Sequence, residues 1–362
     1  MKTTCLHDLH KELGAQMSPF GGFDMPIQYE GIVEEHNAVR EACGVFDVSH
    51  MGEVLVTGPR ATEFVNYIFT NDVTAAAPGQ CLYGMMLNEQ GGVVDDLLVY
   101  VLENANYLLV INASNIDKDV NWILHHAKDF DCTVTNQSDD YGELAIQGPE
   151  AEKVITNVLG LEIDDLKFYT FKIIDFGQHR IIVSRTGYTG EDGFEIYADR
   201  ELTRMFWSRL IASGQAKPCG LGCRDTLRFE VALPLYGDEL ADDITPLEAG
   251  LGIFVKLDKP DFIGRDAIAK QKAEGPARKI VGLEILDRAI ARHGTEVLDP
   301  DGNVIGTVTT GYRGISVDKS LAMALIDARF AALGTKLQVK VRRKIFPAEV
   351  VSKKFYKKSY KK

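Results

Sequence analysis

Three apolar runs between residues 81 and 112 limit the folds open to this chain most strongly. The run 81–87 is followed by the turn Asn-Glu-Gln-Gly-Gly, and the run 93–102 by the turn Glu-Asn-Ala-Asn, before a third run at 107–112. Turns this short join neighbouring strands in antiparallel order, whereas parallel strands need a crossover of about a dozen residues or more. We therefore expect an antiparallel meander and an α+β chain, not a doubly wound α/β fold.

Helical periodicity marks other parts of the chain. After residue 113 apolar residues recur at helical spacing, and Ser114 or Asn115 is the expected N-cap. The expected buried stripe of this helix consists of Ile116, Val120, Ile123, Leu124 and Ala127. Further helices are expected at or just after Ile32, Pro59, Pro149 and Leu202. Gly44 is expected to end the first of these.

The C-terminal part differs in character from the rest. A length of 362 residues suggests two or three domains at about 150 residues each. Residues 276–362 are rich in short apolar runs broken by turns, such as Asp-Pro-Asp-Gly-Asn at 299–303. We expect this part to form a separate β-barrel or jelly roll, joined to the rest by the polar stretch 258–275.

Charge is also divided unevenly along the chain. Residues 276–362 contain 18 Lys and Arg against 8 Asp and Glu, a balance of +10, and the net charge of −12 then leaves −22 for residues 1–275. An acidic body argues against general nucleic-acid binding, because phosphate affinity needs clustered cations. The basic end suits a small acidic ligand, an acidic partner protein or a simple solubilising role.

Several classes of protein are not expected. No apolar run reaches the roughly 18 residues of a membrane span, and the N-terminus lacks the apolar core of a signal peptide. The six cysteines are scattered, and only Cys219 and Cys223 are close, so we expect free thiols, no metal site and a reducing, cytoplasmic location. The chain also lacks the P-loop, the third glycine of a dinucleotide fingerprint, H-E-x-x-H and G-x-S-x-G.

Two adjacent carboxylates interrupt the middle apolar run. Asp95 and Asp96 follow Gly-Gly-Val-Val, and strand alternation sends their side chains to opposite faces. Burying an unpaired carboxylate costs several kcal/mol. The buried member must therefore be satisfied by structural donors or face a ligand, and the residues alone leave both readings open.

A glycine-rich hairpin is expected around residues 186–195. Tyr188 at its tip could stack on a flat ring, and Glu195 in the following strand could accept two hydrogen bonds from a guanidine-like ring edge. The alternative, favoured by the local pattern, is a plain hairpin with an exposed tyrosine and a surface glutamate.

A glycine-rich lead into a helix begins at Gly220. Arg224 near its start could bind a carboxylate with help from the free backbone N–H groups. The alternative is a weak surface pair, either Arg224 with Asp225 or Arg228 with Glu230. A lone His50 further upstream is expected to be structural.

Together these segments resemble the aminomethyltransferases, or T-proteins, of the glycine cleavage system. The resemblance covers nearly the whole chain and keeps the order of the family's motifs. The matching segments are 46–51, 70–73, 91–97, 147–149, 184–191, 220–228, 262–265 and 278–283. Two departures stand out: Phe23 replaces a tryptophan common in the family, and the family's Ser-Pro is missing after Gly311.

The resemblance implies a three-domain cloverleaf around one folate site. Residues 1–53 with 140–275 would form the first subdomain, 54–139 an inserted α+β subdomain, and 276–362 the C-terminal β-barrel domain. The implied reaction passes the methylene of an aminomethyl group on the lipoyl arm of H-protein to tetrahydrofolate. Its products are 5,10-methylenetetrahydrofolate, ammonia and dihydrolipoyl H-protein, with no metal, nucleic acid or membrane involved.

The resemblance also assigns roles to single residues. Asp96 would orient the folate and stabilise positive charge as an iminium forms. The implied folate contacts are Glu195 at the pterin edge, Tyr188 against the ring, and Arg224, Tyr83, Met51, Asn112 and Tyr360. Two alternative functions remain: a folate-binding accessory protein of iron–sulfur assembly, whose hairpin motif contains a cysteine that this chain lacks, and a related folate-dependent demethylase.

Overall fold

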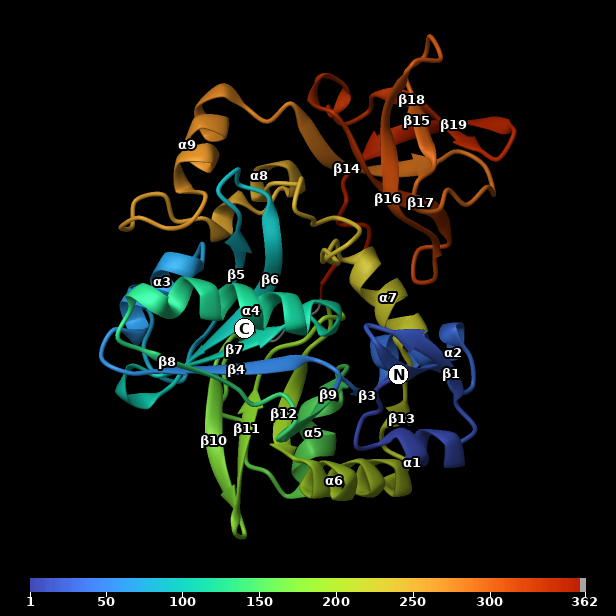
Figure 1. Cartoon of the computed structure of the whole chain (residues 1–362). Helices are drawn as coiled ribbons and strands as arrows, with labels where there is room; N and C mark the ends of the chain where they lie inside the picture. The colour runs from blue at the N-terminus through green and yellow to red at the C-terminus, as the bar shows by residue number, and fades with distance from the viewer. Residues whose placement is uncertain (359–362) are drawn as a thin grey trace.

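The computed structural model describes residues 1–358, and Figure 1 shows three strand-rich bodies arranged around a common centre. The expected α+β class is confirmed, because nearly all strand pairs are antiparallel and the strands cluster by hairpins. At the N-terminus, a short helix precedes a two-stranded hairpin. These elements are α1 (His7–Glu12), β1 (Gln16–Phe20) and β2 (Phe23–Gln28).

A six-stranded sheet forms the lower body in Figure 1, in the order β10-β11-β12-β9-β3-β13. Its strands are β3 (Gly44–Asp47), β9 (Tyr141–Gln147), β10 (Phe171–Phe176), β11 (His179–Ser184), β12 (Gly193–Asp199) and β13 (Lys217–Pro218). Helices α5 (Ala151–Val154) and α6 (Arg200–Ser213) pack against it. Leu202, Phe206 and Leu210 of α6 are buried, as their helical spacing predicts.

A five-stranded sheet forms from the chain between β3 and β9, in the order β5-β6-β7-β4-β8. Its strands are β4 (Gly52–Thr57), β5 (Cys81–Leu87), β6 (Val93–Val101), β7 (Tyr107–Ile111) and β8 (Thr133–Asn136). Strands β5, β6 and β7 are the predicted meander. Helices α3 (Ala61–Ile68) and α4 (Ile116–His126) share an apolar core with this sheet, in which Phe64 and Ile123 are fully buried.

Two local expectations are wrong. Helix α2 (Ile32–Glu41) ends before Gly44, which instead begins β3. Gly44 is needed for close packing, because a Cβ there would lie 2.5 Å from Val39 Cγ2 and 2.7 Å from Cys219 Sγ. In α4, Leu124 is 44% exposed and does not belong to the buried stripe. The sheet covers a narrower face of this helix than the apolar pattern suggests.

The C-terminal part is a closed barrel, which confirms the predicted β domain. Its strand order is β14-β17-β16-β15-β18-β19, and an apolar core that includes Leu283, Ala324 and Val339 fills it. The strands are β14 (Arg278–Ile285), β15 (Glu296–Leu298), β16 (Val304–Gly314), β17 (Lys319–Asp327), β18 (Lys336–Val341) and β19 (Lys344–Val351). Helices α8 (Pro246–Ala249) and α9 (Arg265–Glu274) precede it.

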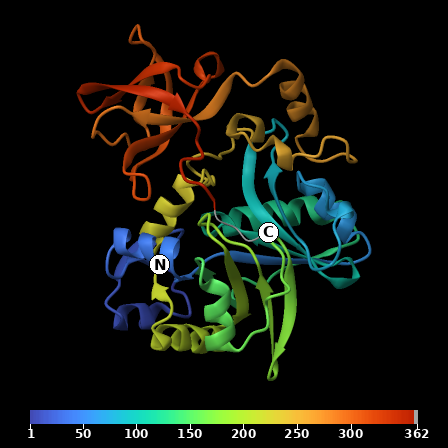
Figure 2. The same ribbon diagram turned by 180° about the vertical axis from the view of Figure 1, so that it is seen from behind.

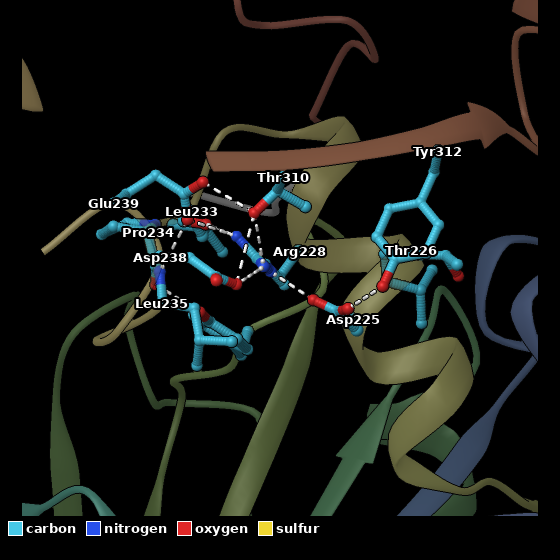
Figure 3. Close-up of polar contacts among 12 residues, drawn as sticks. Asp225, Thr226, Arg228, Leu233, Pro234, Leu235, Asp238, Glu239, Thr310 and Tyr312 are labelled. Carbon is cyan, nitrogen blue, oxygen red and sulfur yellow. Dashed lines mark hydrogen bonds and ion pairs between the residues drawn. The ribbon is translucent and has the colours of Figure 1, made fainter. Parts of the chain in front are cut away.

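Helix α7 (Leu221–Glu230) joins the lower body to the barrel. Its Arg228 is fully buried and donates to Asp225 (2.6 Å), Glu239 (2.7 Å) and Thr310 of β16 (3.1 Å), as Figure 3 shows. Arg228 therefore does not form a surface pair with Glu230, which is itself fully buried. The guanidinium links α7 to the segment that holds Asp238 and Glu239 and, through the Thr310 hydroxyl, to the barrel.

The chain after β19 runs back from the barrel towards the centre, as Figure 2 shows in red. Phe355 packs on Phe229 of α7 with ring centroids 5.2 Å apart, and the Tyr356 N–H donates to the Glu230 carbonyl at 2.8 Å. Within residues 1–358, no helix combines the length and the apolar character needed to cross a membrane.

Candidate active site

The carboxylate of Asp96 lies on β6, in the middle strand of the predicted meander. Tyr83 on the adjacent strand β5 donates its hydroxyl to Asp96 Oδ2 at 2.9 Å. Asn112, the first residue after β7, donates Nδ2 to Asp96 Oδ1 at 2.9 Å. Neighbouring strands thus supply one neutral donor to each oxygen, and they fix the plane of the carboxylate.

Asn112 also binds the other carboxylate of the pair. Its Nδ2 lies 2.8 Å from Asp95 Oδ1, and its backbone N–H donates to Asp95 Oδ2 at 3.0 Å. Asn115 donates to Asp95 Oδ1 at 2.8 Å. The fully buried Asp95 is therefore satisfied by amide donors on the α4 side of the sheet, whereas Asp96 is half-buried on the other face. Structural donors therefore satisfy Asp95, which is one of the two readings left open for the pair; that Asp96 faces a ligand stays a prediction.

Among residues 1–358, no lysine, arginine or histidine forms an ion pair with Asp96. Burial and the adjacent Asp95 raise the pKa of Asp96 to about 7, although the Tyr83 and Asn112 hydrogen bonds oppose this rise. A carboxyl group with a pKa near neutrality changes its charge easily at the pH of the cell. Such a perturbed group is typical of a functional site.

A second carboxylate, Glu195 on β12, is held by a buried chain of hydroxyl groups. Thr186 donates to Glu195 Oε2 at 2.5 Å, and Thr186 Oγ1 lies 2.6 Å from Ser184 Oγ. Ser184 in turn bonds the Tyr100 hydroxyl at 2.9 Å. Burial is the main cause that raises the pKa of Glu195, opposed by Thr186 and by Arg224. The predicted plain hairpin with a surface glutamate is wrong, because Glu195 is only 6% exposed.

The hairpin itself is shaped by Gln147 at the end of β9. Its Nε2 donates to the Thr186 carbonyl at 3.1 Å, and its Oε1 accepts from Thr189 at 2.9 Å. A Cβ at Gly187 would lie 2.1 Å from Gln147 Oε1, and one at Gly193 would lie 2.5 Å from its Nε2. These two glycines let the hairpin close over the glutamine and hold Tyr188 between them and α7.

Tyr188 and Arg224 form the third part of the site. The Arg224 guanidinium lies over the Tyr188 ring, 4.8 Å from its centroid, and the Tyr188 hydroxyl donates to the Pro234 carbonyl. Among residues 1–358, Arg224 Nη1 is buried without a hydrogen-bond partner. The expected alternative of an Arg224–Asp225 surface pair is wrong, because Asp225 instead bonds Arg228 and Tyr312.

Electrostatic interactions join these parts into one region. Asp96 acts on the Tyr188 hydroxyl, Tyr188 acts on Tyr83, and Arg224 acts on Glu195. Met51 lies apart from these contacts, where the apolar clusters of the two sheets meet. The remaining predicted residue, Tyr360, lies outside the described residues.

Several polar residues near Arg224 are missed by the sequence interpretation. Glu143 on β9 is buried, its Oε2 is unpartnered within residues 1–358, and Glu195 and Arg224 act on its charge. His50, which the sequence analysis expects to be structural, is buried nearby, and burial lowers the pKa of His50 to about 4, so the ring is neutral. Glu143 interrupts an apolar strand just as Asp95 and Asp96 do, so the same buried-charge argument identifies it.

A group of possible metal ligands lies elsewhere, where Glu35, Cys219 and Cys223 approach one another. Glu35 Oε1 accepts from the backbone N–H groups of Tyr29 (2.6 Å) and Glu30 (3.1 Å), and Oε2 accepts from that of Gly220 (2.8 Å). Backbone donors therefore occupy both oxygens. We interpret Glu35 as a structural residue that links the backbone at Tyr29 and Glu30 to the backbone at Gly220.

The candidate site combines carboxylates, aromatic rings and one arginine. Asp96 and Glu195 can accept hydrogen bonds from N–H groups, and Tyr188 with Tyr83 can flank a flat ring. Arg224 can bind an anionic group with the N–H that is left unpaired. This set of groups suits a nitrogen-rich heterocycle that develops positive charge during reaction.

Comparisons with known proteins agree over the whole chain. The family description "GCVT N-terminal domain" matches residues 6–259, and "Glycine cleavage T-protein C-terminal barrel domain" matches residues 278–357. An aminomethyltransferase of Alkaliphilus oremlandii is 49% identical over 100% of this chain and 99% of its own. One of Caldanaerobacter subterraneus is 48% identical over 100% and 98%. The crystal structure of glycine cleavage system aminomethyltransferase T from Bartonella henselae superposes with a TM-score of 0.95 at 34% identity, covering 100% of this chain and 99% of that one.

Proposed function

This chain belongs to the family of glycine cleavage system aminomethyltransferases, the T-proteins, and from that premise we propose how it works. The methylene of an aminomethyl group, carried on the lipoyl arm of H-protein, is transferred to tetrahydrofolate. The methylene carbon leaves the lipoyl sulfur and the amino nitrogen, and it forms bonds to N5 and N10 of the folate. Ammonia, dihydrolipoyl H-protein and 5,10-methylenetetrahydrofolate result.

The observation that carries the proposal is the carboxylate of Asp96, which Tyr83 and Asn112 hold and which pairs with no cation of the described part of the chain. The reaction passes through a cationic iminium, and a fixed carboxylate stabilises such a charge better than mobile water does. Asp96 therefore acts in its ionised form. Its preset plane orients the folate near N10, so that N5 meets the methylene carbon.

The other predicted residues bind the folate in this proposal. Glu195 accepts hydrogen bonds from the N–H edge of the pterin, and Tyr188 contacts the ring. Arg224 completes the folate contacts with its free N–H. Tyr83 and Asn112 line the pocket while they hold Asp96, and Met51 supplies apolar contact. Tyr360 is proposed as a further contact from the C-terminal segment.

The proposal also covers the domain division, the cellular compartment and the need for a metal. We propose the division into residues 1–53 with 140–275, 54–139, and 276–362, because the five-stranded sheet is inserted between β3 and β9. The six cysteines, all free thiols, suit a reducing cytoplasm. The transfer is proposed to need no metal, because Asp96 supplies the electrostatic stabilisation.

An assay with purified partners tests the function. Lipoylated H-protein loaded with the aminomethyl group, tetrahydrofolate and this chain should yield ammonia and methylenetetrahydrofolate, and omission of either partner should abolish both products. Addition of EDTA should leave the rate unchanged. Transfer from another methyl donor, with none from loaded H-protein, would contradict the proposal and favour the demethylase alternative. Folate binding without transfer would favour the accessory-protein alternative.

A further inference from the structure

A third carboxyl group, Asp119, lies behind the Asp-Asp pair on helix α4. It is on the buried stripe of that helix, one turn after Ile116 and one turn before Ile123, and it is 0% exposed. An aspartate at such a position has no packing advantage over an apolar residue, and its burial is costly. Its presence therefore calls for a partner within the molecule.

That partner is itself a carboxylate. Among residues 1–358, neither oxygen of Asp119 accepts a hydrogen bond from an N–H or hydroxyl donor. Asn115, four residues earlier and so on the same face of this helical segment, donates to Asp95 Oδ1 at 2.8 Å, which places this face against Asp95. The Asp95 carboxyl group is accordingly, after burial, among the causes that raise the pKa of Asp119, and a carboxyl–carboxyl contact is the hydrogen bond open to it. Two carboxyl groups form such a contact only when one of them keeps its proton, because two carboxylates repel each other and have no hydrogen to share.

The proton belongs on Asp119. Asp95 already accepts hydrogen bonds from the N–H groups of Asn112 and Asn115. Asp119 has no such donors, and burial together with the contact to Asp95 raises the pKa of Asp119 to about 11. Lys118 Nζ lies 3.8 Å from Asp119 Oδ1, but it is bound to the Val94 carbonyl and the Tyr236 hydroxyl.

We propose that Asp119, as a neutral acid, is a positioning residue for Asp96: it donates to Asp95, which orients Asn112 and thereby holds the reacting carboxylate. The relay is continuous, because Asn112 Nδ2 lies 2.8 Å from Asp95 Oδ1 and 2.9 Å from Asp96 Oδ1. This inference rests on the proposed role of Asp96.

The relay has an electrostatic consequence as well as a geometric one. A donor on the far side of Asp95 draws its negative charge away from Asp96, and this makes ionisation of Asp96 easier. The charged and titratable groups that face the Asp95–Asp96 pair come from several elements: Tyr83 on β5, Lys118 and Asp119 on α4, Tyr188 in the hairpin, and Tyr236. Asp119 is the member of this set that acts on the pair through Asp95.

The pH profile of kcat in the complete transfer assay tests the relay, with Asp119→Leu and Asp119→Asn as the variants. Leucine removes the donor, so the acidic limb of kcat should move up by roughly one pH unit. At pH 7 kcat should then fall about fivefold and recover at higher pH, with KM for tetrahydrofolate little changed. Asparagine keeps an uncharged donor, so the limb should stay in place.

Controls separate this from a structural role. Asp117→Leu lies on the same helix turn but at an exposed position, and it should leave the profile unchanged. A limb of Asp119→Leu that coincides with that of the unaltered enzyme, with kcat lowered equally at every pH, would overturn the inference. If the leucine variant does not fold, Asp119→Asn still decides: a downward shift of its limb would show that Asp119 is ionised. Full turnover by Asp96→Asn would instead overturn the proposed role of Asp96.

Discussion

Two buried polar clusters of this protein are built in opposite ways. At the joint between α7 and the barrel, the guanidinium of Arg228 is met by Asp225, Asp238 and Glu239, as seen in Figure 3. Burial alone would lower the pKa of Arg228, but Glu239 and Asp225 outweigh it and raise that pKa. At the candidate active site, burial and Asp95 raise the pKa of Asp96, and the hydrogen-bonding residues are neutral.

This difference in charge balance suits a structural role for the cluster around Arg228 and the proposed catalytic role for the cluster around Asp96. A buried charge that is matched by opposite charges keeps one protonation state and stabilises one arrangement of the chain. A buried carboxylate that is held by neutral donors keeps its geometry but lacks a counterion, and a cationic intermediate can supply one. Burial by itself does not separate the two cases, whereas charge balance does.

The largest expected effect breaks the compensated cluster. Arg228→Ala removes the cation that three carboxylates share, of which Glu239 is almost fully buried, and the free energy of unfolding should fall by about 3–5 kcal/mol. Urea denaturation followed by circular dichroism measures this loss. Arg329→Ala is the control, because the Arg329 side chain is 80% exposed and its pair with Asp327 should contribute little to stability. Equal stability of the two variants would contradict the structural role of the joint.

Glu195→Gln should act on binding more than on folding. The amide presents an N–H where the pterin edge also presents N–H groups, so a charged hydrogen bond worth about 1.5–3 kcal/mol is lost. The KM for tetrahydrofolate should rise by tenfold or more while kcat changes less, and steady-state kinetics separates the two. Ile196→Val, on the opposite face of β12, is a matched control. A Glu195→Gln variant with unchanged KM would remove Glu195 from the folate contacts.

A smaller effect is expected from Tyr83→Phe. It deletes the hydroxyl that donates to Asp96 Oδ2 and leaves the ring packed against Phe254, with centroids 4.9 Å apart. That hydrogen bond favours the carboxylate, so its loss should raise the pKa of Asp96 further and move the acidic limb of kcat upward by up to about one pH unit. A limb that moves downward or not at all would show that Tyr83 does not set the charge of Asp96.

The sequence predicts which buried side chains are charged better than it predicts which residues bind them. Asp96 can be found because a carboxylate in an apolar strand is costly, and the meander that holds it follows from its short turns. The burial of Arg228 cannot be found in this way, because Glu239 approaches it through an irregular segment that has no periodic pattern, and Thr310 comes near only when the barrel docks on α7. The burial of Asp119 can be predicted from the sequence, because Asp119 interrupts the buried stripe between Ile116 and Ile123.

The sequence alone also does not predict where the hairpin around residues 186–195 lies relative to strands β5 and β6. The spacing of glycines predicts a tight turn near Tyr188, but only the folded chain shows Gln147 inside that turn and Arg224 over the Tyr188 ring. For that reason the local pattern around Glu195 favoured a surface glutamate, and the family resemblance was needed to assign it a place in the site.

The central claim is that Asp96 is kept at a cost to the fold for the sake of the reaction. Because its folded pKa lies above its unfolded value, its contribution to stability is present at low pH and is lost as the pH rises through about 7. The decisive measurement is the free energy of unfolding of Asp96→Asn at pH 8, taken beside its transfer rate. The variant should be at least as stable as the unaltered protein while turnover falls by about a hundredfold or more and tetrahydrofolate still binds. Retained turnover, or a loss of stability like that of Arg228→Ala, would contradict the claim.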